Sequence, residues 1–311
     1  MFLPLLHIGN YNGPFLLAWN FDPLVTIGLI VSAVGYYWAL RRVREAGRYE
    51  HPTWQVLCFY GGLLTIVLAL LGPFDMYNDD VFTFHMIQHM ILIQATAPLL
   101  LFGRPVQLAL RAISPKDSGP VLRTILRPRG VRAVLTFLTN PIVAFFLFNG
   151  AIVLWHFPQF YDVALVNETV HVIEHMTFLG VALLYWWPMI DPIPRHHKMK
   201  RTWAVISVFF SMMISSNGLG AILTLADSVI YAPYLSNPNP FGWDAHSDQQ
   251  MGGLLMWVAG GMIWLFVALG IIIRILQLEN RKVEKQQEAW DALADSGEWD
   301  ESPRPITTDP V

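Results

Sequence analysis

Seven apolar runs, each about 20 residues long, divide the chain between residues 23 and 276. A helix of about 20 mostly apolar residues is what crosses the hydrocarbon core of a bilayer. Charged residues make up only 14% of the 311 residues, against about 25% in a typical soluble domain. The sequence therefore predicts an all-α, polytopic membrane protein, a bundle of seven transmembrane helices. The predicted spans are about 23–40, 54–74, 82–102, 141–158, 168–190, 202–225 and 252–276.

The basic residues fix the predicted orientation of this bundle. Four Lys or Arg follow the first span, seven lie between the third and fourth, four between the fifth and sixth, and five at the end of the last span and in the tail. These are all 20 cationic side chains, and all fall on one side of a seven-span arrangement. Because short cytoplasmic loops are enriched in Lys and Arg, we expect the N-terminus outside and the C-terminus in the cytoplasm.

Three regions follow from this topology. Residues 1–22 form an extracytoplasmic segment without Lys or Arg, so the basic start of a signal peptide is not expected. Residues 23–276 form the membrane domain, whose connection 103–134 is predicted to place short amphipathic pieces on the anionic inner leaflet. Residues 277–311 form a cytoplasmic polar tail that begins as a helix and ends in a stretch expected to be disordered.

Five histidines lie at the predicted outer ends of spans three, four and five. His85 and His89 stand in "FHMIQHMIL", His171 and His175 in "NETVHVIEHMTFL", and His156 in "LWHFP" between them. The i, i+4 spacing places each pair on one helix face, about 6 Å apart along the axis. A single histidine on an apolar face is more often bonded to a carbonyl or carboxylate than to a metal. Two such pairs at one membrane depth, where ionisable groups are expensive, favour a metal site at His85, His89, His156, His171 and His175.

Methionines next to these histidines bear on which metal would bind. Met86, Met90 and Met176 each directly follow a cluster histidine. Imidazole suits zinc, copper, iron and nickel, whereas thioether sulfur favours Cu(I). Successive helical residues point about 100° apart, so these methionines cannot all join their neighbours, and methionine in spans usually serves packing. Cys58, the chain's single cysteine, lies near the cytoplasmic end of span two, far from these histidines. Histidine and methionine without a nearby cysteine favour copper, Cu(I) in particular, with zinc or haem as alternatives.

Acidic and polar residues extend the candidate site. Glu168 shares a helical stripe with His171 and His175, and Glu174 lies on its flank. The outer loop 226–251 carries acids and no cation, and such a rim would attract metal ions or a basic partner surface. Asp248 also suits the N-terminal dipole of the seventh span. The auxiliary candidates for metal or partner contact are Met86, Met90, Glu168, Glu174, Met176, Asp227, Asp248, Gln249 and Gln250.

Span six carries hydroxyls and an amide inside the membrane. Ser211, Ser215, Ser216 and Asn217 stand in "FFSMMISSNGLGAIL" beside small glycines. Small residues permit close helix contact, and polar side chains bond across helices. Helix packing is the main interpretation, and the lining of a metal or proton path is the alternative.

Three stretches together resemble the bacterial CtaG-type assembly factors of caa-type cytochrome c oxidase: "HMIQHMILIQATAPLLLFGRP", "LWHFPQFYDVALVNETVHVIEHMTFLGVALLYWWP" and "ADSVIYAPY…DQQMGGLLMWVAGG". The resemblance covers roughly residues 20–276. It implies a multi-pass protein of the bacterial cytoplasmic membrane that helps mature a haem–copper oxidase by handling copper. The implied partners are apo-oxidase subunits and an extracytoplasmic copper chaperone, besides the lipid bilayer, with no nucleic acid. The family matches fall on His85, His89, His156, His171, His175, Asp227, Asp248, Gln249 and Gln250.

The leading hypothesis is a non-enzymatic factor that binds copper at the outer membrane surface and delivers it to the apo-oxidase. "HVIEH" at 171–175 also fits the short H-x-x-E-H motif of inverted zinc proteases, with Glu174 as general base. A haem-binding cytochrome is a further alternative, although paired i, i+4 histidines would leave one of each pair unused. A metal transporter or a structural scaffold stays open, because the polar residues of span six could line a path.

Overall fold

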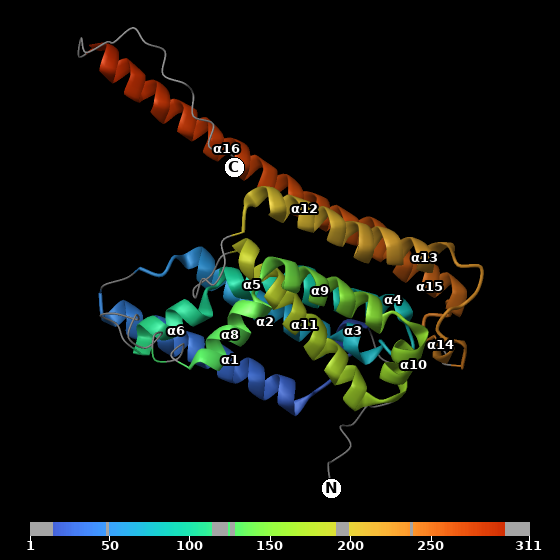
Figure 1. The fold of residues 1–311 in the computed structure, drawn as a ribbon. Helices are drawn as coiled ribbons and strands as arrows, with labels where there is room; N and C mark the ends of the chain where they lie inside the picture. The colour runs from blue at the N-terminus through green and yellow to red at the C-terminus, as the bar shows by residue number, and fades with distance from the viewer. Residues whose placement is uncertain are drawn as a thin grey trace.

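The computed structural model describes residues 15–47, 50–113, 124, 128–190, 199–236 and 239–295 (Figure 1). All regular elements in these ranges are helical, which confirms the all-α prediction for this part of the chain. Most of the predicted N-terminal segment and the end of the tail, residues 1–14 and 296–311, lie outside the described residues. So do residues 114–123 of the predicted amphipathic connection.

In the described part of the chain, nineteen helices and turns of helix build the bundle that positions the candidate site. The first half of the chain holds a 3₁₀ turn (Phe15–Leu17), α1 (Pro23–Glu45), α2 (Thr53–Leu70), α3 (Pro73–Met76), α4 (Phe82–Met90), the π-helix η2 (Ile91–Thr96), α5 (Ala97–Phe102), α6 (Pro105–Ile113) and α8 (Arg129–Leu138). The second half holds α9 (Pro141–Trp155), α10 (Pro158–Val166), α11 (Glu168–Ile190), α12 (Arg201–Ser211), the π-helix η3 (Met212–Gly218), α13 (Leu219–Leu225), α14 (Pro233–Ser236), α15 (Ala245–Leu254), the π-helix η4 (Leu255–Gly260) and α16 (Gly261–Asp295).

Local chemistry explains where the long helices begin. Asp22 and Asn140 are N-caps whose side-chain oxygens accept hydrogen bonds from the second and third backbone N–H groups of α1 and α9. Each is followed by a proline, Pro23 or Pro141, at the first helical position. Proline suits that position because its fixed φ matches the helix and its missing N–H would have no helical partner.

Length and composition mark five helices as able to cross a membrane: Pro23–Glu45, Thr53–Met76, Phe82–Ile113, Arg201–Leu225 and Ala245–Ala292. The pair Arg129–Leu138 and Pro141–Trp155, bent by 64°, makes a sixth if it counts as one span. The protein is therefore a helical, multi-pass membrane protein with five or six such segments. α11, which corresponds to the predicted span 168–190, is not among them, so the count of seven and the orientation of the termini stay predictions.

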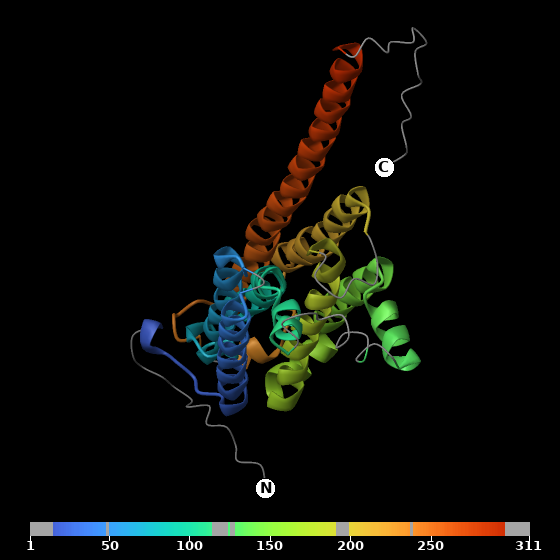
Figure 2. The same ribbon diagram turned by 90° about the vertical axis from the view of Figure 1, so that its left-hand side faces the viewer.

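The helix α11 lies at the centre of the largest core cluster. Its buried Phe178, Tyr185 and Trp186 pack with Phe148 of α9 and Trp264 of α16, and the rings of Trp186 and Trp264 stack 5.4 Å apart. The segments α12 to α13 and α15 to α16 run side by side along the bundle, and α16 extends well beyond it (Figures 1 and 2). α4 contacts α11 through His85 and His89 and packs against α15, so it lies between the two helices that complete the candidate site.

Candidate metal centre

The helix α4 begins at a carboxylate from a distant part of the chain. Asp248 of α15 accepts hydrogen bonds from the backbone N–H groups of Phe82, at 2.8 Å, and Thr83, at 3.1 Å. These are N–H groups of the first turn of α4, which have no acceptor within the helix. Asp248 thus fixes the start of the helix that carries His85 and His89.

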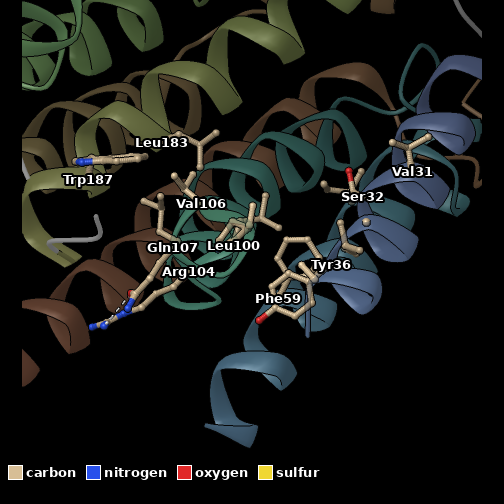
Figure 3. Close-up of a pocket in the computed structure, with 17 residues that line it drawn as sticks. Val31, Ser32, Tyr36, Phe59, Leu100, Arg104, Val106, Gln107, Leu183 and Trp187 are labelled. Atoms are coloured by element: carbon tan, nitrogen blue, oxygen red, sulfur yellow. Dashed lines mark hydrogen bonds between the residues drawn. The ribbon is translucent and has the colours of Figure 1, made fainter. Parts of the chain in front are cut away.

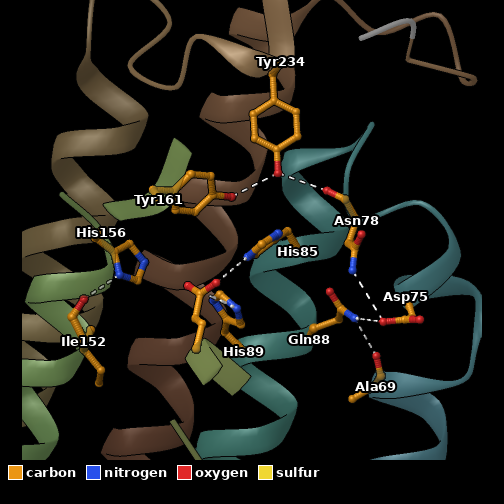
Figure 4. Close-up of polar contacts among 11 residues, drawn as sticks. Ala69, Asp75, Asn78, His85, Gln88, His89, Ile152, His156, Tyr161 and Tyr234 are labelled. Atoms are coloured by element: carbon orange, nitrogen blue, oxygen red, sulfur yellow. Dashed lines mark hydrogen bonds and ion pairs between the residues drawn. The ribbon is translucent and has the colours of Figure 1, made fainter. Parts of the chain in front are cut away.

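A second contact fixes the opposite face of α4. The Nε2 of Gln88 donates to the carbonyl oxygen of Ala69, at 2.7 Å, and to Oδ1 of Asp75, at 3.0 Å (Figure 4). Gln88 is fully buried, so these bonds anchor α4 to the end of α2 and to α3. With that face held, His85 and His89 face α11.

The two histidine pairs meet between α4 and α11. The ring centroids of His85 and His171 lie 5.1 Å apart, and those of His89 and His175 lie 5.3 Å apart. Within each helix the paired rings are 4.4 Å and 4.3 Å apart. All four side chains are buried. The i, i+4 spacing on each helix, read from the sequence, therefore produces a single imidazole cluster across two helices.

Glu174 completes this cluster from α11. Its Oε2 lies 3.8 Å from Nε2 of His85, and its Oε1 lies 3.7 Å from Nε2 of His89. One ligand atom each from His85, His171 and Glu174 lie within 4.8 Å of one another. Two donors bound to one tetrahedral metal ion through bonds of about 2.1 Å lie about 3.4 Å apart. The spacing around Glu174 is close to what a shared cation requires.

The cluster holds buried polar atoms without a hydrogen bond. Both carboxylate oxygens of Glu174 and both ring nitrogens of His85 and His89 have no such partner in the part of the chain that the structure describes. Buried polar groups are nearly always bonded, and each orphaned one costs about 1–3 kcal/mol. A cation bound by Glu174, His85 and His89 would satisfy the carboxylate and one nitrogen of each ring, so the residues fit a metal ion.

His156 has its ring orientation set by the backbone. Its Nδ1 lies 2.7 Å from the carbonyl oxygen of Ile152 (Figure 4). A carbonyl only accepts, so Nδ1 carries the proton and Nε2 keeps the lone pair. A carbonyl bond of this kind orients many metal-ligating histidines. His156 does not join the rings around Glu174; together with His89 it lines a cavity of about 30 Å³ beside them.

Aromatic residues that sequence reasoning missed cover the cluster on the α10 side. The ring of Tyr161 lies 5.1 Å from that of His85 and stacks on Tyr231 at 3.8 Å. Tyr234 donates its hydroxyl proton to the carbonyl oxygen of Asn78, at 3.0 Å, so the hydroxyl of Tyr161, 3.0 Å from that of Tyr234, is the donor between them (Figure 4). Tyr231 lies in a loop, where no periodic pattern signals a buried residue.

Apart from Glu174, the auxiliary candidates contribute no atom to the cluster and lie in different places. Glu168, Met176 and Asp227 are exposed and contribute no atom to the cluster. Gln249 holds the loop that follows α13, since its Oε1 accepts from the N–H of Ile230 at 2.6 Å and its Nε2 donates to the carbonyl oxygens of Leu223 and Ser228. Gln250 is half-buried on α15. Asp248 caps α4, and Met86 and Met90 line the small cavity beside His89.

A larger cavity, of about 440 Å³, lies among α1, α2, α5, α6 and α11 (Figure 3). Its walls are mostly apolar, with Tyr36, Phe59 and Leu100 on one side and Leu183 and Trp187 on the other. It adjoins Arg104, at the far end of the continuous helical stretch that starts with α4. None of the predicted site residues lines it, so its size does not mark the candidate metal centre.

Fold and cluster together define a class: multi-pass helical membrane proteins with a buried imidazole–carboxylate centre between two helices. Residues 34–277 match the family described as cytochrome c oxidase caa3 assembly factor (Caa3_CtaG), and the chain belongs to this family. The resemblance stated from the sequence motifs is confirmed. The family description names oxidase assembly as the role of this family.

Among curated proteins, the chain is similar to "Uncharacterized protein ML1998" of Mycobacterium leprae, at 29% identity over 287 residues, and to "Uncharacterized protein Mb0105" of Mycobacterium bovis, at 28% over 299 residues. These alignments cover 91% and 90% of this chain but 42% of each relative. The chain therefore spans less than half the length of the relatives it matches. No solved structure matches it.

Proposed function

We propose that this protein assists assembly of a bacterial haem–copper cytochrome c oxidase by binding copper at the centre formed by His85, His89, His171, Glu174 and His175 and delivering it to the apo-oxidase. The observation that carries the proposal is the set of buried, unbonded donor atoms around Glu174. The family description supplies the oxidase, and the resemblance to factors that help mature a haem–copper oxidase supplies copper as the cargo. In this proposal copper is a substrate, held only until transfer.

The donors of the centre suit divalent copper. Imidazole and carboxylate are borderline and hard ligands, which suit Cu(II) and Zn(II), whereas Cu(I) prefers sulfur. Met86 and Met90 do not enter the centre, so the preference for Cu(I) inferred from them does not rest on this cluster. Zinc is the alternative that the donors themselves leave open. Haem gains no support, since the cavity that adjoins the cluster measures about 30 Å³.

We further propose that α11 is the fifth of seven spans. Its 23 residues extend about 34 Å at 1.5 Å per residue, enough to cross the hydrocarbon core. Its mean hydropathy is lowered by His171, Glu174 and His175, and these three side chains are buried inside the protein. A central helix shielded by its neighbours does not need an apolar surface on every side.

The proposed orientation places the centre near the outer face of the bacterial cytoplasmic membrane, with an apo-oxidase subunit and an extracytoplasmic copper chaperone as partners. Arg44, Arg104 and Arg111 lie close enough to His51 to disfavour its protonation, so these cations gather at one end of the bundle. Arg104 follows α5, whereas His85 lies near the start of α4, at the other end of the same continuous helical stretch. Cytoplasmic cations at one end agree with an outer centre at the other.

Metal titration of the purified full chain tests the proposal. We expect about one equivalent of Cu(II) at the centre and strongly reduced uptake in His85→Ala and Glu174→Gln. His246→Gln is the matched control, because His246 bonds the carbonyl oxygen of Ala226 away from the cluster. Unchanged uptake in both centre variants would contradict copper binding there.

A second measurement addresses the assembly role. In a bacterium that lacks its own factor of this family, the wild-type chain should restore copper content and activity of the oxidase, and His85→Ala should not. Full restoration by a variant that no longer binds copper would contradict delivery. The H-x-x-E-H protease hypothesis gains no comparable support, because Glu174, its would-be base, is fully buried.

A further inference from the structure

The cavity beside His89 has room for one small occupant. Its volume of about 30 Å³ is close to that of a single water molecule. The cavity lies in the membrane domain between α4, α9 and the three π-helices η2, η3 and η4. We call it the methionine chamber, because Met86, Met90 and Met256 line it together with His89 and His156.

The chamber and the imidazole centre use adjacent stripes of α4. His85 and His89 form the stripe facing α11, and Met86 and Met90, each one residue further, form a second i, i+4 stripe. Met86 packs in one buried cluster with Met256 of η4, and Met90 packs against that cluster. His89 belongs to both places, since it approaches Glu174 on one side and lines the chamber on the other.

The donor set of the chamber differs in kind from that of the centre. Three thioethers and two imidazoles line it, together with the amide of Gln94 and the hydroxyls of Ser215 and Ser216, and none of the described residues that line it carries a carboxylate. Thioether sulfur is a soft donor that selects Cu(I) over divalent ions. His156 carries its proton on Nδ1, so the lone pair is on Nε2. This Nε2 is buried and has no hydrogen-bond partner in the described chain. The ring nitrogens of His89 are likewise buried without a hydrogen bond.

Three π-helical stretches converge on the chamber. Gln94 belongs to η2 (Ile91–Thr96), Ser216 to η3 (Met212–Gly218) and Met256 to η4 (Leu255–Gly260), and each lines the cavity. π-helical turns are rare in proteins, and those that occur are often found at functional sites. Three of them meeting at one small polar cavity is more than helix packing needs.

The wall of the chamber is also closely fitted. A Cβ added at Gly260 would lie 3.1 Å from Oγ of Ser216, 3.4 Å from Nε2 of Gln94 and 3.5 Å from Cε of Met90. The absence of a side chain at Gly260 thus lets these three residues approach the cavity. The Oε1 of Gln94 is a further buried atom without a hydrogen bond in the described chain.

We propose that the methionine chamber is a Cu(I) site, separate from the imidazole–carboxylate centre and linked to it through His89. Met86, Met90 and Met256 supply the sulfur ligands, and His156 with His89 supplies nitrogen. The proposal rests on the proposed function only for the choice of copper as the physiological metal. The centre then suits the divalent ion and the chamber suits the monovalent ion, and His89 adjoins both.

Titration of the purified full chain with Cu(I), anaerobically and against a Cu(I)-specific chelator, tests the chamber. The double variant Met90→Leu/Met256→Leu keeps side-chain volume close to that of wild type. We expect it to weaken Cu(I) binding by about 100-fold or more and to leave Zn(II) uptake at the centre unchanged. Met176→Leu and Met251→Leu are the controls, because both methionines are exposed, and both should bind Cu(I) as wild type does.

X-ray absorption at the copper edge identifies the ligands directly. Wild type and Glu174→Gln loaded with one equivalent of Cu(I) should show copper–sulfur scattering, and the double methionine variant should not. Only nitrogen and oxygen ligands in the wild type, or unchanged Cu(I) affinity in the double variant, would overturn the proposal. Loss of Cu(I) binding with normal oxidase assembly would support the chamber and contradict copper delivery instead.

Discussion

Asp248 holds Phe82 by a hydrogen bond of 2.8 Å from the backbone N–H of Phe82 to the carboxylate, across 166 positions of sequence. The same carboxylate accepts from Thr83, and the hydroxyl of Thr83 donates back to the carbonyl oxygen of Asp248. α15 therefore sets where α4 begins and, through α4, where His85 and His89 lie. Sequence reasoning took Asp248 as a metal or partner contact or as a residue suited to its own helix dipole, whereas its contacts are those of a cap on another helix.

Asp248→Ala should therefore act on both stability and metal binding. Loss of the cap leaves two buried N–H groups without an acceptor, which should lower the free energy of unfolding by about 1–3 kcal/mol. Metal affinity should fall as well, because the first turn of α4 loosens. Thermal unfolding in detergent, with and without added metal, measures both effects. Asp22→Ala removes a comparable cap from α1 and should leave metal affinity unchanged; equal losses of affinity in the two variants would contradict this account.

Glu174→Gln separates two effects of the buried carboxylate: its cost to the stability of the metal-free protein and its contribution to metal binding. Without metal, the variant should be at least as stable as wild type, because a buried carboxylate without good partners is expensive. With metal, a ligand at 100 times its Kd stabilises the wild type by about 2.7 kcal/mol, and most of that gain should disappear in the variant. The shift of Tm on metal addition measures this difference. Glu168→Gln, exposed at the start of the same helix, should keep the full shift, and so would Glu174→Gln if Glu174 were only a structural residue.

Gly252→Ala tests the close approach of α15 to α4. A Cβ at this position would lie 2.6 Å from two ring atoms of Phe82, a distance that forces something to move. Overpacking of this kind costs about 1–3 kcal/mol, and the displaced Phe82 would carry the start of α4 with it. We expect a lower Tm and weaker metal binding. Gly28→Ala, which has open space around its Cβ, should be neutral or slightly stabilising, so a loss confined to Gly28→Ala would refute the packing argument.

Local spacing predicted the parts of the site that one helix carries. The i, i+4 pairs at His85/His89 and His171/His175 do face each other, and the 100° rotation per residue does turn Met86 and Met90 away from the imidazole centre. The same rotation leaves Met176 exposed, since it places this side chain away from His175. Helical periodicity determines the direction in which each side chain leaves its own helix, and all of these predictions concern such directions.

Contacts between segments that are distant in the chain could not be predicted from the sequence, because no local residue pattern signals them. Nothing local indicates that Asp248 caps a helix 166 positions away or that Tyr231, in a loop, stacks on Tyr161. The π-helices were equally hidden, because an i→i+5 turn has no residue pattern of its own. The segment 168–190 was expected to cross the membrane, yet its buried polar residues keep α11 outside the segments that length and composition select.

A last prediction concerns His51, between α1 and α2 and away from the metal centre. Tyr36 donates its hydroxyl proton to the carbonyl oxygen of Gly103, at 2.9 Å, so the hydroxyl oxygen accepts from Nε2 of His51, at 2.8 Å. Burial lowers the pKa of His51 below its usual 6.5, and the positive charges of Arg44, Arg104 and Arg111 lower it further, against the effect of a backbone hydrogen bond at Gly103. The ring is therefore neutral in the folded protein at pH values where the unfolded chain is already protonated.

Since the unfolded state binds this proton first, the contribution of His51 to stability is complete above about pH 6.5 and is lost as the pH falls below that value. Tm measured from pH 7.5 to pH 5.5 should fall less steeply in His51→Gln, which keeps an N–H donor for Tyr36 but cannot titrate. The other histidines are common to both proteins, so the difference between the two curves isolates His51. If His51→Gln instead follows the wild-type curve, the folded protein takes up the proton at His51 as readily as the unfolded chain does, and burial at this end of the bundle leaves the ring free to charge.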